Sequence, residues 1–208
     1  MKSSNIFLYG PSGSGKSTVG KKLADALNMD FLDLDAKIEI DLGDSITNTI
    51  QSKGEEVFRD AETAALENAV LPPSVLSDIS PLRGEKQPQP PSGDNASENA
   101  TGSLPHRGGG RGGAVIALGG GALLRAQNQR IAEETGTIIF LEADVPTLVQ
   151  RLSADANKRP LLAGELDEKL AKLPDTRAAH YGTFTTRVDA SQPPAELVCP
   201  IQRPLRPP

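Results

Sequence analysis

A glycine-rich segment near the start of the chain carries a lysine and a hydroxyl group at a spacing suited to phosphate binding. Residues 10–18, GPSGSGKST, fit the pattern G-x-x-x-x-G-K-[ST]. Glycines let successive backbone N–H groups point at phosphate oxygens, and a helix beginning near Lys16 would add its positive end. Lys16 would reach the β- and γ-phosphates, and Ser17 would ligate Mg²⁺. The segment predicts phosphoryl transfer; the alternative is a glycine-rich turn that fits by chance.

Two nearby acidic residues supply a candidate metal ligand and a candidate base. Asp33 and Asp35 lie in the sequence FLDLDAKIE, and we expect them to alternate at the end of a strand, with side chains on opposite faces. One carboxylate would face the metal and the other a substrate hydroxyl, whose proton it could accept. The alternative is two solvated acids at a strand end.

An arginine and a glutamate three residues apart form the next candidate. Arg59 and Glu62, in the sequence GEEVFRDAE, would be neighbours on one face of a helix. The glutamate could hold the guanidinium for bidentate recognition of a carboxylate. The alternative is an ordinary surface ion pair.

Three further segments each allow two interpretations. Gly119–Gly121 follow a predicted strand and would either let a ligand approach the backbone closely or form a tight turn. Arg159, in the polar loop NKRPLLAG, would either bring a cation to the phosphates on a mobile lid or be solvated. Arg177, in LPDTRAAHY, is ambiguous by itself.

The elements that must position these residues alternate between short apolar runs and segments of helical spacing. Such alternation predicts an α/β fold with a parallel sheet covered on both faces, and ligands bind at the carboxyl ends of such strands. Predicted strands cover 5–9, 31–34, 114–118, 137–141 and 187–189. Predicted helices cover 16–27, 45–52, 55–70, 125–135 and most of 166–184, and Asp144 would cap another.

Length and charge limit the possible functions. The chain has 208 residues, enough for one globular domain, and a formal net charge of −5, which disfavours nucleic acid and anionic membranes as partners. Cys199 is the single cysteine, which suits a reducing compartment. No run of residues is apolar enough for a membrane helix, and we expect no targeting segment ahead of the phosphate loop. These features predict a soluble cytoplasmic protein.

Two stretches differ from the rest of the chain in composition. Residues 72–113, called the insert below, are dense in proline, glycine and serine, and we expect them to be disordered. The insert would interrupt a single domain over residues 1–198. Residues 199–208, CPIQRPLRPP, contain four prolines, which predict an irregular tail.

Taken together, the motifs resemble those of shikimate kinases. The phosphate loop, DLD, GEEVFRDAE, GGG, RPLL and the segment from Arg177 to HY occur in that family's order, and the resemblance covers residues 4–71 and 114–198. It implies a P-loop fold like that of nucleoside monophosphate kinases, with a five-stranded parallel sheet in the order 2-3-1-4-5. It also implies transfer of the γ-phosphoryl group of ATP to the 3-hydroxyl of shikimate, in the biosynthesis of chorismate and the aromatic amino acids.

The resemblance also implies a role for each candidate residue. Lys16, Asp35 as the base, and Arg159 would be catalytic; Ser17, and Asp33 through water, would hold Mg²⁺. Arg151 would lie against adenine, near Gln192. The expected ATP-binding residues are Gly13, Ser14, Gly15, Lys16, Ser17, Thr18, Arg151, Arg159 and Gln192. The expected shikimate-binding residues are Asp35, Arg59, Gly119, Gly120, Gly121 and Arg177.

Some features depart from the family pattern and leave other functions open. Ile50 stands where many members carry an aromatic residue, and both the insert and the tail are unusual. One alternative is another small-molecule P-loop kinase, acting on gluconate or adenylylsulfate. A second is a catalytically weak kinase fold that binds a protein partner through the insert. We expect ATP and shikimate as the partners of a monomer; the alternative is fusion to, or association with, another enzyme of the pathway.

Overall fold

A five-stranded parallel sheet organises the residues that the structure, a computed structural model, describes: 5–71, 113–156, 177 and 179–202. The sheet has the order β2-β3-β1-β4-β5, and every adjacent pair is parallel. This confirms the predicted fold class and strand order. The strands are β1 (Asn5–Tyr9), β2 (Asp30–Asp33), β3 (Ala114–Ala117), β4 (Gly136–Glu142) and β5 (Arg187–Asp189).

Helices follow most of the strands, as the alternating pattern predicted. The predicted bounds of α1 and α4 agree with the structure, those of α3 differ by one residue at each end, and those of α6 differ by one residue at the start. The helices are α1 (Lys16–Leu27), α2 (Leu34–Leu42), α3 (Ile46–Lys53), α4 (Glu55–Val70), α6 (Ala126–Thr135), α7 (Val145–Ala156) and α9 (Pro194–Gln202), with a short 3-10 turn, η1 (Ala122–Leu124).

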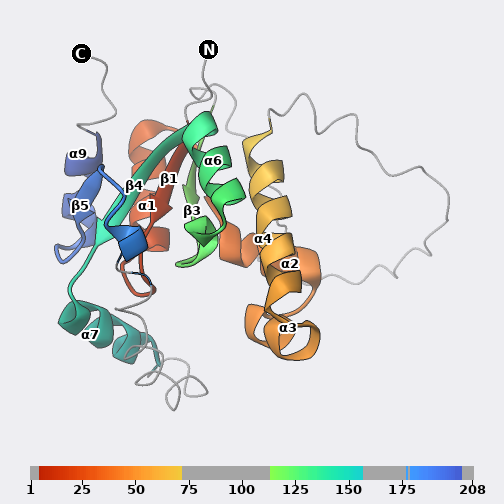
Figure 1. Cartoon of the computed structure of the whole chain (residues 1–208). Helices are drawn as coiled ribbons and strands as arrows, with labels where there is room; N and C mark the ends of the chain where they lie inside the picture. The colour runs from red at the N-terminus through yellow and green to blue at the C-terminus, as the bar shows by residue number, and fades with distance from the viewer. Residues whose placement is uncertain (1–4, 72–112, 157–176, 178, 203–208) are drawn as a thin grey trace, which may run out of the picture.

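The central strand β1 distributes its side chains between two hydrophobic layers. Ile6 and Leu8 face the layer that α1 and α9 cover, whereas Phe7 and Tyr9 face the layer that α4 and α6 cover. All of these side chains are buried, which accounts for the continuous apolar run in this strand. Figure 1 shows these helices around the sheet. Tyr9 thereby lies on the same side of the sheet as α4.

The carboxyl ends of the strands collect the segments that carry the candidate residues. The phosphate loop joins β1 to α1, Gly119–Gly121 follow β3, and α7 follows β4. In Figure 1, α7 and α3 lie on opposite sides of this end of the molecule. Parallel strands therefore bring motifs that are 100 residues apart in sequence to one edge.

The structure corrects the expected strand over residues 31–34. Strand β2 ends at Asp33, and α2, which was not predicted, begins at Leu34. Asp33 caps this helix by accepting a hydrogen bond from the N–H of Ala36, and Leu34 and Ile38, one turn apart, are buried. Asp35 therefore lies in the first turn of a helix, and the expectation that it alternates with Asp33 along a strand is wrong.

A second correction concerns the irregular tail expected from Cys199 onward. Helix α9 continues to Gln202, with Pro200 inside it. Pro200 removes one backbone hydrogen bond, but Leu197 and Ile201, one turn apart, are both buried against the layer that includes α1. Their burial outweighs the proline at this position.

Several predictions fall outside the described residues. They are the insert except its last residue, the Arg159 loop, and most of the helix expected over 166–184. Among the helices that the structure does describe, none is both long enough and apolar enough to cross a membrane.

Candidate functional site

The phosphate loop has a backbone conformation that depends on its glycines. Gly13 and Gly15 have φ values of +81° and +92°, in the left-handed region that side-chain-bearing residues rarely adopt. A Cβ on Gly13 would also lie 2.9 Å from Cγ of Leu152, because α7 packs on the loop. The loop leads directly into α1, so the N–H groups of the first turn face the same region.

Lys16 folds back over this loop. Its Nζ donates hydrogen bonds to the carbonyl oxygens of Gly10 and Pro11, both at 2.9 Å. Burial lowers the pKa of Lys16 to about 8, and the nearby carboxylates of Asp35 and Asp33 oppose this shift. An anion in the loop would favour the charged form of the lysine.

Ser17 and Asp33 bring two oxygen atoms together beside the loop. The Ser17 hydroxyl donates to Oδ2 of Asp33 at 2.5 Å. A hydroxyl and a carboxylate suit Mg²⁺, which takes few protein ligands and completes its shell with phosphate and water oxygens. Within the described residues, no group of three or more His, Cys, Asp or Glu side chains could hold a metal by itself. With its two oxygen ligands, the pair fits a Mg²⁺ ion whose remaining ligands are phosphate and water oxygens.

The glycine turn after β3 lies against three of the other candidate groups. A Cβ on Gly119 would lie 2.7 Å from Oδ1 of Asp35, and a Cβ on Gly121 would lie 2.9 Å from Nη2 of Arg59. A Cβ on Gly120 would lie 3.4 Å from the carbonyl oxygen of Gly10 in the phosphate loop. The turn therefore joins an acid, a cation and the phosphate loop.

Asp35 has the electrostatic environment of a base. Burial raises its pKa, the Lys16 ammonium opposes this, and the carboxylate of Asp33 raises it further. A carboxylate with a raised pKa accepts a proton more readily than a solvated one. The alternative of two solvated acids does not describe this half-buried residue.

Arg59 is fixed by two carboxylates and an aromatic ring. Its Nη1 donates to Oε2 of Glu62 at 2.9 Å, and its Nη2 donates to Oε1 of Glu55 at 3.0 Å. The guanidinium also lies 5.0 Å from the ring centroid of Phe58. Glu62 is only 1% exposed, so this is not an ordinary surface pair. Burial raises the pKa of Glu62, and Arg59 opposes that shift.

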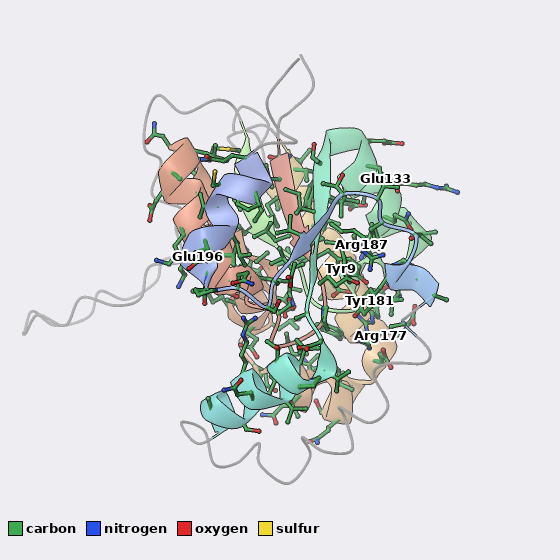
Figure 2. The ribbon with its side chains drawn as sticks, turned by 90° about the vertical axis from the view of Figure 1, so that its left-hand side faces the viewer. Tyr9, Glu133, Arg177, Tyr181, Arg187 and Glu196 are labelled. Atoms are coloured by element: carbon green, nitrogen blue, oxygen red, sulfur yellow. The ribbon has the colours of Figure 1, made fainter. Side chains whose placement is uncertain are left out.

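Arg177 lies beside Tyr181, whose hydroxyl contacts the glycine turn. It lies one helical turn before Tyr181 and is half-buried. Burial raises the pKa of Tyr181, and the charge of Arg177 and a hydrogen bond from it oppose that rise. Figure 2 shows Arg177, Tyr181 and Tyr9 near one another. The charges of Arg177 and Arg59 both act on the Tyr9 hydroxyl, so the two arginines share one neighbourhood.

The expected adenine-binding residues lie on the opposite side of the phosphate loop. From α7, Arg151 donates through Nη1 to the carbonyl oxygen of Ser14 at 3.4 Å. Its Nη2 donates to the carbonyl oxygens of Ser191 and Gln192, at 3.2 and 3.4 Å. Thr18 is exposed in the first turn of α1. Arg151 therefore joins the phosphate loop to the segment between β5 and α9.

Sequence reasoning missed two sets of residues around the glycine turn. Arg125 donates to Oδ1 of Asp60 at 2.8 Å and also binds Glu56, which anchors the segment after the turn to α4. The acids lie four residues apart on α4, a spacing that could have suggested a shared partner. The hydroxyls of Tyr9 and Tyr181 both bind the carbonyl oxygen of Gly120, which no local pattern indicates.

Comparison with known proteins relates the chain to one group of kinases. The family model described as shikimate kinase matches residues 12–77 and 106–202. A shikimate kinase of Chlorobium chlorochromatii is 34% identical over 167 residues, covering 80% of this chain and 67% of that protein. Shikimate kinase 2 of Escherichia fergusonii is 30% identical over 201 residues, covering 95% and 89%. The structure of shikimate kinase from Acinetobacter baumannii in complex with shikimate matches with a TM-score of 0.67 and 26% identity, covering 97% and 92%.

Proposed function

Because the chain belongs to the shikimate kinase family, we propose that it transfers the γ-phosphoryl group of ATP to the 3-hydroxyl of shikimate, giving shikimate 3-phosphate and ADP. The observation that carries this is the glycine turn, which contacts Asp35, Arg59 and the phosphate loop together. A base, a carboxylate-binding cation and a phosphate site around one turn suit phosphorylation of a hydroxylated acid. The reaction is a step in the formation of chorismate and the aromatic amino acids.

Asp35 acts on the acceptor hydroxyl. Its carboxylate orients the 3-hydroxyl and takes its proton as the hydroxyl oxygen bonds to the γ-phosphorus and the bond to ADP breaks. The raised pKa of Asp35 supports this role, as does its position near the ammonium group of Lys16, which interacts electrostatically with the carboxylate. Lys16 stabilises the negative charge on the transferred group.

Arg59 and Arg177 hold the carboxylate of the acceptor. The acids Glu55 and Glu62 fix the guanidinium of Arg59 from two directions, which presents it in one orientation. The backbone of Gly120 and Gly121 lies between this cation and the phosphate loop and contacts the ring hydroxyls. Two anionic substrates repel each other, so several cations are needed at the point where they meet.

The phosphate loop and α7 hold the nucleotide. Backbone N–H groups of the loop and of Thr18 bind the phosphates, and Arg151 lies against adenine near Gln192. Mg²⁺ is held by Ser17 and, through water, by Asp33; it neutralises phosphate charge when bound. Arg159 closes over the phosphates.

The remaining expectations concern the whole protein. We propose that residues 1–198 form one domain, with the insert looping out, and that the protein is a cytoplasmic monomer, which its single cysteine suits. Replacing residues 73–112 with a short Gly/Ser linker is then expected to leave kcat within about 2-fold, since loop length affects stability only weakly. Loss of turnover in a folded variant would refute the looping-out.

The experiment that tests the function measures ADP release with shikimate and with gluconate as acceptors. We expect turnover with shikimate, and a fall in kcat of about 10²- to 10⁴-fold in Asp35→Asn, because the amide cannot accept the proton. Asp41→Asn, an exposed acid on the same helix, is the matched control and should keep wild-type kcat. Activity on gluconate alone would replace the assignment with a different sugar-acid kinase. A folded, inactive protein that binds a partner through the insert would favour the binding module.

A further inference from the structure

One carbonyl in the glycine turn accepts hydrogen bonds from two tyrosines. The hydroxyl of Tyr181 donates to the carbonyl oxygen of Gly120 at 2.8 Å, and the hydroxyl of Tyr9 donates to the same atom at 3.3 Å. Tyr9 is the last residue of β1, and Tyr181 comes from the helical segment that carries Arg177. Two distant parts of the chain therefore converge on a single peptide group, a region that Figure 2 shows.

The orientation of that peptide group determines where both its carbonyl and its N–H point, because the two groups belong to one planar unit. The described residues contain no cis peptide bond, so the carbonyl of Gly120 and the N–H of Gly121 point in opposite directions. Holding the carbonyl toward the tyrosines holds the N–H away from them. Glycines on both sides of a peptide allow it to rotate more freely than other residues would, so an external constraint is needed to select one orientation.

The two hydroxyls are well suited to hold it. Tyr9 is fully buried, and its ring lies 5.6 Å from that of Tyr181 and 5.1 Å from that of Phe184, with edge-on packing. Burial raises the pKa of both tyrosines above the usual value of about 10, so both remain protonated donors at neutral pH. A ring fixed by its neighbours holds its hydroxyl in one place.

We propose that Tyr9 and Tyr181 are positioning residues that together orient the peptide between Gly120 and Gly121, so that the N–H of Gly121 donates to the acceptor substrate. The inference rests on the proposed function, because the acceptor is shikimate. A Cβ on Gly121 would lie 2.9 Å from Nη2 of Arg59, so the residue whose N–H is oriented is a direct neighbour of the cation that we propose binds the carboxylate. The tyrosines act through the backbone and do not themselves bind substrate.

The test uses Tyr9→Phe, Tyr181→Phe and the double variant of the full chain. Phenylalanine keeps the ring and removes only the hydroxyl, so the aromatic packing is retained. Each single variant is expected to raise KM for shikimate about 2- to 10-fold, the usual worth of one hydrogen bond, with KM for ATP unchanged. The double variant should exceed the product of the two single effects, since in each single variant the remaining hydroxyl still holds the carbonyl.

Controls separate positioning from stability and from the function itself. Thr135→Val removes a hydroxyl that donates to the carbonyl oxygen of Ile131 within α6, and it should leave both KM values unchanged. If the double variant keeps the wild-type KM for shikimate, or if KM for ATP rises equally, the inference is overturned. If the wild-type protein fails to turn over shikimate, the proposed function fails first, and the inference fails with it.

Discussion

Adding one methyl group at Gly119 is expected to disable the base without unfolding the protein. Gly119 does not have a positive φ, so alanine is compatible with its backbone. The new Cβ would lie 2.7 Å from Oδ1 of Asp35 and 3.1 Å from Oε1 of Glu62, whereas an ordinary contact begins at 3.4 Å. The Asp35 carboxylate must therefore move by about 0.7 Å, the difference between these contact distances.

A displacement of this size matters because, in the proposed mechanism, Asp35 contacts the acceptor hydroxyl during transfer. Misplacing a reacting group by about 1 Å can lower a rate by about 10²-fold, so we expect kcat of Gly119→Ala to fall roughly 10- to 100-fold. KM for shikimate should change less, because the new Cβ contacts neither Arg59 nor Arg177, and Glu62, which holds Arg59, would have to move by only about 0.3 Å to reach an ordinary contact. Steady-state kinetics of ADP release with varied shikimate measure both constants, and urea unfolding checks the fold.

Gly121→Ala is the companion variant that distinguishes the two halves of the site. Its Cβ would lie 2.9 Å from Nη2 and 3.1 Å from Nη1 of Arg59, so it displaces the cation that we propose binds the carboxylate. We expect KM for shikimate to rise about 10-fold, with a smaller change in kcat. Wild-type kcat in Gly119→Ala, or the same change of kcat and KM in both variants, would refute the division of roles between Asp35 and Arg59.

Three further outcomes follow from the fold and its charges. The pKa of Lys16 is lowered to about 8 from the usual 10.5, so between these pH values the unfolded chain binds more protons than the folded chain. The free energy of unfolding of the wild type, relative to that of Lys16→Met, should therefore rise with pH. Urea unfolding at pH 8, 9 and 10 measures this difference, and a flat or falling difference contradicts the prediction. Pro200→Ala should stabilise the protein by about 1–3 kcal/mol in urea unfolding, because it restores a helical hydrogen bond, and it should leave kcat unchanged. A lower free energy of unfolding in this variant would show that proline is favourable at this position. Arg125→Gln should raise KM for shikimate, because it removes the ion pair that holds the segment after the glycine turn on α4. The control Arg187→Gln breaks an ion pair with β4 and should leave this KM unchanged. Equal KM values in the two variants would exclude a role for Arg125 in holding the glycine turn.

Local patterns were sufficient to predict most elements and the phosphate loop. The apolar runs of β1, β3 and β4 each contain at least three consecutive buried residues, so they are visible without knowledge of their partners. Helix α2 was missed because its buried positions, such as Leu34 and Ile38, lie among charged residues directly after a strand. The last residues of helix α9 were expected to be irregular because a proline inside a helix is locally unfavourable, and the burial of Ile201 is not visible in the local sequence.

The types of residue in the site, and therefore its chemistry, follow from the sequence. Lys16, Asp35 and Arg59 each belong to a short motif whose residues lie within a few positions of one another. Tertiary structure alone decided which of these groups meet, because contacts between separate elements depend on the sheet and not on spacing along the chain. Folding places Asp35 in a helix against Gly119, and it brings Tyr9 and Tyr181 to one carbonyl from positions 172 residues apart.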